Sequence, residues 1–191
     1  CVPCGFHQGK QGEIRMKHAI AVALAAALFA AGTGIATAAP KPRADASMYH
    51  GKEANEAGRA LLDVALKQAG KGSWERIGVG RAYYLGGFKA EGQAIFDALL
   101  DGKHEDSDVY RIARVYQEAG EWDRAKPLFD RYLASNPDDE KGLAEVGAYY
   151  LLHGDRARAE QLFDRSFQAS PDEVWATLAA ADAYLNVKPE E

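Results

Sequence analysis

The sequence predicts an all-α fold, an α-solenoid of stacked helix–turn–helix repeats. Residues 116–137 are echoed by residues 150–171 without a gap, at a spacing of 34 residues, and such a period is typical of repeat architectures. Apolar residues recur at helical spacing, and no segment alternates as a strand does. The residues that recur between the two stretches are Tyr116 and Tyr150, Gly120 and Gly154, Ala125 and Ala159, Phe129 and Phe163, and Pro137 and Pro171.

Composition bounds the function classes. The chain has 191 residues, of which 47% are hydrophobic, and its net charge is −5. A nucleic-acid-binding surface usually needs a basic excess, so we expect no nucleic-acid partner. Residues 39–191 hold 20 basic and 27 acidic residues and no cysteine, which excludes disulfides and thiolate metal sites there.

The N-terminal third contains a leader pattern. Met16-Lys17-His18 precedes an uncharged apolar run that ends in small residues at Ala36-Thr37-Ala38. This order predicts a signal peptide over residues 16–38, cleaved after Ala38, and a periplasmic or secreted product. The alternative is an uncleaved anchor, because the run is just long enough to cross a bilayer. Its glycines and many alanines favour cleavage, which would leave no stable membrane span.

Residues 1–15 precede the natural start at Met16. Gly12-Glu13 can be encoded GGA-GAG, a purine-rich ribosome-binding sequence, so we interpret residues 1–15 as translated upstream sequence. N-terminal sequencing of the exported product tests this interpretation. Cys1 and Cys4 have the spacing of a redox pair, but that motif needs a βαβ context that the sequence does not offer.

The rest of the chain is expected to be helical after a linker. Residues 39–50 predict a flexible linker, since prolines oppose helix formation. Pro127 lies inside an expected helix and predicts a kink or a loosened first turn at residues 122–126. The expected helices are 51–69, 74–85, 89–100, one capped by Ser107 or Asp108 and ending at Ala119, one between Gly120 and Pro137, one through Leu143 and Tyr150, one through Ala159 and Phe167, and 174–187.

These helices group into repeats over residues 73–105, 106–139 and 140–173, with a degenerate helix in 51–72 and an end helix at 174–187. The pattern resembles the tetratricopeptide repeat (TPR), a 34-residue helix–turn–helix unit. The resemblance implies a right-handed solenoid in which each repeat buries its faces only against its neighbours. The matching positions are Gly80, Ala113, Gly147 and Ala181 for the small residue, Tyr83, Tyr116, Tyr150 and Tyr184 for the tyrosine, and Phe96, Phe129 and Phe163 for the phenylalanine.

The resemblance also implies a concave groove lined by the first helix of each repeat. Arginine pairs with carboxylates and aromatic rings give rigid contact area, so such a groove suits a protein or peptide partner. The alternative for each residue is an ordinary solvated helix face. The expected groove residues are Trp74, Arg81, Tyr84, Tyr110, Arg114, Gln117, Lys141 and Trp175.

No catalytic pattern is present in the sequence. His50, His104 and His153 lie far apart and lack metal-ligand spacing, and residues 70–73 lack the upstream glycine of a phosphate loop. We therefore expect no enzyme activity, cofactor or metal. The sequence predicts an exported scaffold or adaptor that binds a protein or peptide partner. The alternative is a self-associating structural component of an envelope assembly, a homodimer formed through the end helix.

Overall fold

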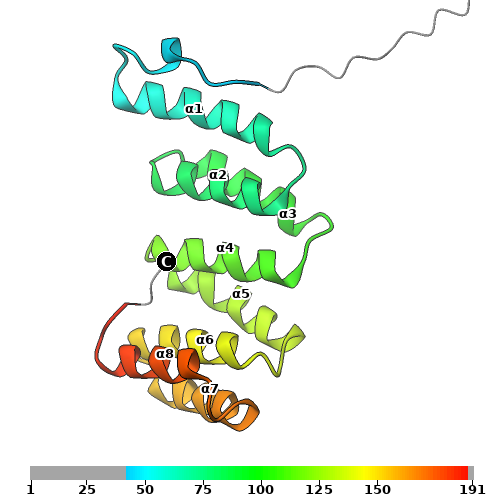
Figure 1. Ribbon diagram of the computed structural model, residues 1–191, viewed down its shortest axis with the longest axis vertical. Coiled ribbons are helices and arrows are strands. Elements are labelled where there is room, and N and C mark those ends of the chain that lie inside the picture. Colours follow the sequence, from blue (N-terminus) through cyan, green and yellow to red (C-terminus); the bar gives the residue numbers. More distant parts are fainter. Residues whose placement is uncertain (1–41, 189–191) are drawn as a thin grey trace, which may run out of the picture. The chain divides into compact units, whose positions relative to one another are not determined.

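The computed structural model describes residues 42–188, and this part of the chain is all-helical. It forms a compact unit of eight α-helices with one 3-10 turn and no strand (Figure 1). None of these helices combines the length and apolar character that crossing a membrane requires. The expectations for residues 1–15 and 16–38 lie outside the described residues. The helices are α1 (Ala54–Ala69), α2 (Ser73–Leu85), α3 (Lys89–Leu100), α4 (Asp106–Glu118), α5 (Trp122–Ser135), α6 (Glu140–Leu152), α7 (Arg156–Ala169) and α8 (Val174–Tyr184).

Most helix limits agree with the sequence, and two ends differ. The cap of α4 was wrongly placed at Ser107 or Asp108: the N-cap is Glu105, whose backbone N–H donates to Asp108 Oδ2 at 3.1 Å. Asp108 is instead a buried residue of the first turn. The end helix α8 stops at Tyr184, three residues before the expected end at Val187.

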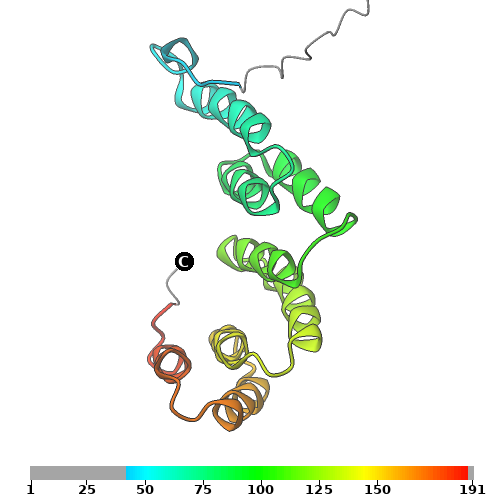
Figure 2. The same cartoon turned by 45° about the vertical axis from the view of Figure 1, so that its right-hand side comes forward.

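The helices pack in consecutive pairs. α2 packs on α3, α4 on α5, and α6 on α7, while α1 contacts α2 (Figures 1 and 2). Neighbouring pairs meet through α2 with α4, α3 with α4, and α5 with α6, and α8 packs mainly on α6. The helices α2, α4, α6 and α8 are called the first helices below.

Three glycines turn the chain within the pairs. Gly87, Gly120 and Gly154 have φ values of 93°, 74° and 86°, which side chains with a Cβ rarely adopt. After each glycine, the next backbone N–H donates to a carbonyl five residues earlier, as Asp155 N does to Tyr150 O at 2.9 Å. These bonds satisfy carbonyls that the end of the first helix would otherwise leave unpaired.

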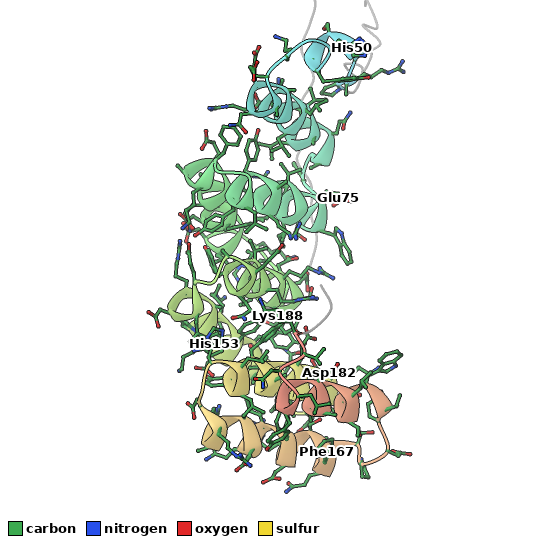
Figure 3. All side chains as sticks on the ribbon, turned by 90° about the vertical axis from the view of Figure 1, so that its left-hand side faces the viewer. His50, Glu75, His153, Phe167, Asp182 and Lys188 are labelled. Atoms are coloured by element: carbon green, nitrogen blue, oxygen red, sulfur yellow. The ribbon has the colours of Figure 1, made fainter. Side chains whose placement is uncertain are left out.

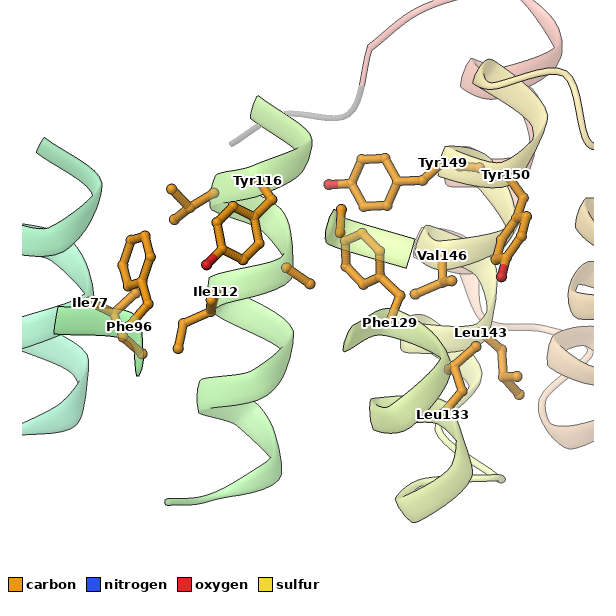
Figure 4. Packing of buried hydrophobic residues seen from close by; sticks show 14 of the residues in the cluster. Ile77, Phe96, Ile112, Tyr116, Phe129, Leu133, Leu143, Val146, Tyr149 and Tyr150 are labelled. Atoms are coloured by element: carbon orange, nitrogen blue, oxygen red, sulfur yellow. The ribbon is translucent and has the colours of Figure 1, made fainter. Parts of the chain in front are cut away.

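The core lies between the two helices of each pair. A Cβ on Gly80 would lie 2.6 Å from the Phe96 ring, and one on Gly147 would lie 2.8 Å from the Phe163 ring. The small residues therefore leave room for the phenylalanine rings of the second helix. Aromatic and aliphatic side chains extend the core from one pair to the next, as Figure 4 shows for Phe96, Ile112, Tyr116, Phe129, Leu143 and Tyr150.

Two local expectations differ from the structure. The linker segment is more ordered than expected, because Asp45 accepts a hydrogen bond from Ser47 N at 2.8 Å and closes a 3-10 turn, Ala46–Met48, that contacts α1. Pro127 lies within α5 without interrupting it. The first turn of α5 keeps its bonds to Glu121 O from residues 124 and 125, so it is not loosened as expected.

Candidate functional site

Three hollows open along the first helices. The first, about 260 Å³, lies between α2 and α4; the second, about 550 Å³, involves α4, α6 and α8; and the third, about 310 Å³, lies between α4 and α6. Arg114 lines the first and second hollows, Glu118 the first and third, and Lys188 the second and third. Because they share these residues, the three form one continuous surface, called the joined hollows below.

Six of the eight expected groove residues line the joined hollows. The first hollow contains Trp74, Arg81 and Arg114. The second contains Lys141 and Trp175 together with Arg114, and the third contains Gln117. Tyr84 and Tyr110 line none of them.

Tyr84 belongs to the core between α2, α3 and α4. Its side chain is 4% exposed, and its ring lies 5.7 Å from that of Phe96 and 5.5 Å from that of Tyr116. The hydroxyl donates to Glu121 Oε2 at 2.6 Å and accepts from Arg124. Burial and the Glu121 carboxylate raise the pKa of Tyr84. This tyrosine cannot meet a partner on the joined hollows without leaving the core.

Tyr110 is half-buried beneath the surface. Its ring packs against Tyr132 and Phe129 of α5, with centroid distances of 4.7 Å and 5.6 Å. Its buried hydroxyl has no hydrogen-bond partner among residues 42–188. Burial and the nearby Glu145 carboxylate raise its pKa well above the usual value. Tyr110 therefore supports the contact between α4 and α5 from below.

The expected cations pair with carboxylates of this chain. Arg81 of α2 bonds Glu118 of α4, with Nε to Oε2 at 2.5 Å. Arg114 of α4 lies 3.6 Å from Glu145 of α6. Lys141 of α6 lies 3.7 Å from Glu173, the N-cap of α8. Each pair joins one first helix to the next, so these cations help to connect the helices as well as lining the surface.

Two tryptophans are the most exposed aromatic rings of the surface. Trp74 is 65% exposed and Trp175 is 64% exposed, and each is the second residue of its helix. The guanidinium of Arg111 lies over the Trp74 ring, 3.8 Å from its centroid. This arrangement is a cation–π contact, and it holds the arginine at the edge of the first hollow.

Arg111 and His153 were not among the residues expected from the sequence. Arg111 lies three residues before Arg114, so helical spacing places both on one face. His153 stacks on Trp122 with a centroid distance of 4.4 Å, and its Nε2 donates to Gln117 Oε1 at 2.8 Å. Burial lowers the pKa of His153. Spacing by 36 residues gives no simple sequence signal for the bond to Gln117.

The joined hollows carry a local positive surplus. Residues 42–188 hold 19 basic and 25 acidic residues, so the surface has the opposite balance to the chain around it. Its cations are Arg81, Arg111, Arg114, Lys141 and Lys188, and its carboxylates are Glu118, Glu145 and Asp182.

The described part of the chain offers no cluster of three or more His, Cys, Asp or Glu side chains that could hold a metal ion. The site is therefore described as a contact surface made of cations and aromatic rings. In comparisons with known proteins, no family model and no curated protein matches this sequence.

Proposed function

We propose that this chain is an exported adaptor, a tetratricopeptide-like right-handed solenoid that binds a protein or peptide partner on the joined hollows. The observation that carries the proposal is the continuity of the surface. Six side chains selected from separate repeats line hollows that share Arg114, Glu118 and Lys188. The repeated glycine turns at 87, 120 and 154 support the repeat architecture.

Recognition on this surface needs no chemical step. The two exposed indole rings offer large contact areas with few torsions to fix, which is typical of residues that dominate binding energy. Arg111 is already oriented by its stacking on Trp74, so less side-chain entropy is lost when it pairs with a partner's carboxylate. The positive surplus favours a segment of opposite charge.

The experiment is capture of partners from an envelope extract with residues 39–191, the form expected after leader removal. The test variant carries Trp74→Ala and Trp175→Ala. Both rings are largely exposed, so their truncation should cost little stability. The matched control is Tyr49→Ala, since Tyr49 is 47% exposed and lines none of the joined hollows.

A partner captured by the parent chain and by the Tyr49 control, but lost by the double variant, supports the proposal. Equal capture by all three chains contradicts it. Reversing the charge of Arg81 would be a poorer test, because Arg81 bonds Glu118. A glutamate at that position would repel Glu118 and disturb the packing of α2 on α4 as well as the surface.

The export part of the proposal rests on the leader pattern in residues 16–38. N-terminal sequencing of the protein recovered from the envelope or medium tests it. We expect a mature chain that begins at Ala39. A chain that still carries Met16 would contradict cleavage and favour a retained anchor.

A second candidate function is self-association through α8. Tyr184 is 45% exposed, whereas its repeat counterpart Tyr150 is 1% exposed beneath α7. Val174 and Leu178 add exposed apolar area to the same helix. Light scattering across a concentration series tests this alternative. A dimer that dissociates when Ala181, an exposed residue of α8, is changed to Glu would favour self-association.

A further inference from the structure

The chain leaves α8 through a left-handed turn at Asn186. Asn186 has φ 56° and is the sole residue other than glycine with positive φ among residues 42–188. Its N–H donates to Ala183 O at 3.2 Å, and the N–H of Val187 donates to Asp182 O at 2.8 Å. This pair of bonds is a Schellman ending, a defined reversal of chain direction at a helix C-terminus.

The corresponding turn of α6 lies two residues further along the repeat. Gly154 has φ 86° and leads the chain into α7. At the 34-residue spacing its counterpart is Lys188, but in α8 the left-handed residue is Asn186. Because each helical residue turns by about 100°, ending two residues earlier rotates the exit by about 200° around the helix. The chain therefore leaves α8 on nearly the opposite side.

The residues after this turn lie in the joined hollows. Val187 lines the second hollow beside Trp175 and Leu178. Lys188 lines the second hollow and also the third, where Gln117 and Tyr149 are its neighbours. Figure 2 shows this red segment doubling back past α8 toward α4 and α6, and Figure 3 shows Lys188 on the same side as Asp182. We call residues 185–188 the strap.

We propose that the second and third hollows are a binding site for this chain's own C-terminal strap. The contacts are complementary in kind. Val187 is apolar and meets the apolar side chains of Trp175 and Leu178, while the Lys188 ammonium enters a hollow that contains the Glu118 carboxylate. A partner that uses these two hollows must displace the strap or bind over it. The seating of the strap does not depend on the adaptor function proposed above.

Engineered cysteines test the seating directly. In the full chain with Cys1→Ser and Cys4→Ser, the test pair is Gln117→Cys with Lys188→Cys, because both residues line the third hollow. The control pair is Gln168→Cys with Lys188→Cys. Gln168 is exposed on α7 and lines a separate hollow that shares no residue with the joined hollows. Mild oxidation is followed by non-reducing electrophoresis and mass spectrometry.

We expect the test pair to form a disulfide within single chains and the control pair to stay reduced. Adding Asn186→Gly should preserve the cross-link, since glycine accepts positive φ. Adding Asn186→Val should slow it about tenfold, because the left-handed conformation is unfavourable for a β-branched residue. Circular dichroism of each variant reports whether the helices are intact. Equal rates in both pairs, or a rate that Asn186→Val leaves unchanged, would overturn the proposal.

Discussion

Arg81 of α2 donates hydrogen bonds from two nitrogens to both carboxylate oxygens of Glu118 on α4, so one planar fork spans two neighbouring pairs of helices. Forked contacts of this kind fix geometry as well as energy. Arg114 and Glu145 make the same type of link between α4 and α6 at a longer distance of 3.6 Å. The surface proposed to bind a partner is thus also a surface that connects successive first helices.

Breaking the Arg81–Glu118 pair should cost little stability, because both side chains retain contact with solvent. For Arg81→Gln or Glu118→Gln we expect a loss of about 0.5–1 kcal/mol in the free energy of unfolding. A double-mutant cycle followed by urea unfolding measures the coupling, which should shrink in high salt. A coupling energy of zero at low salt would show that the fork does not connect the helices energetically.

Two glycines at equivalent repeat positions should respond oppositely to alanine. A Cβ on Gly92 would lie 2.6 Å from Gly80 O and 2.8 Å from Tyr84 N, so α2 and α3 would have to move apart. We expect Gly92→Ala to lower the free energy of unfolding by about 1–3 kcal/mol, as overpacking does. Thermal and urea unfolding followed by circular dichroism measure the change.

Gly58 is the matched control. No atom lies within 4 Å of a Cβ at Gly58 in α1, so Gly58→Ala should raise stability by about 0.5–1 kcal/mol through helix propensity. If both substitutions shifted stability in the same direction, the close crossing of α2 and α3 would not be the reason for glycine at position 92.

Alkaline pH should unfold the domain through its buried tyrosines. Burial and the Asp63 carboxylate, which accepts a hydrogen bond from Tyr83 at 2.6 Å, raise the pKa of Tyr83 to about 12. A tyrosine in the unfolded chain ionises near pH 10. The native state therefore holds more protons between these values, and stability is full below pH 10 and falls as pH rises toward 12.

The same direction applies to Tyr132 and Tyr149, whose pKa values burial and nearby carboxylates raise. Phenolate absorbance and circular dichroism recorded together on one sample measure the effect. We expect helix loss and tyrosine ionisation to coincide. Complete ionisation near pH 10 in a chain that keeps its helices would contradict the burial described here.

The sequence predicted the helical class and most helix limits, because the signals are local. A glycine two residues after a run of apolar residues at helical spacing placed the turns at Gly87, Gly120 and Gly154. Small and aromatic residues at a fixed period predicted which positions cross closely, as Gly80 and Phe96 do. These features depend on backbone conformation and side-chain volume, which the residue type states directly.

Side-chain direction and pairing between helices were harder to predict. Tyr83 and Tyr84 are adjacent, and both are buried, whereas Tyr84 was expected on the surface. The partners of Arg81 and Arg114 lie 37 and 31 residues away, so no local pattern identifies Glu118 and Glu145. The early end of α8 depends on Asn186 adopting positive φ, a conformation that asparagine permits without requiring it.

Side-chain footprinting of Trp74 and Trp175 tests the central claim most directly. Hydroxyl radicals would be applied to the chain alone and to its complex with the protein captured from envelope extract, with Tyr49 as the internal reference. The account predicts that both tryptophans lose reactivity in the complex while Tyr49 does not. Unchanged reactivity of both tryptophans, with protection confined to Tyr184 on α8 or to other residues outside the joined hollows, would contradict it.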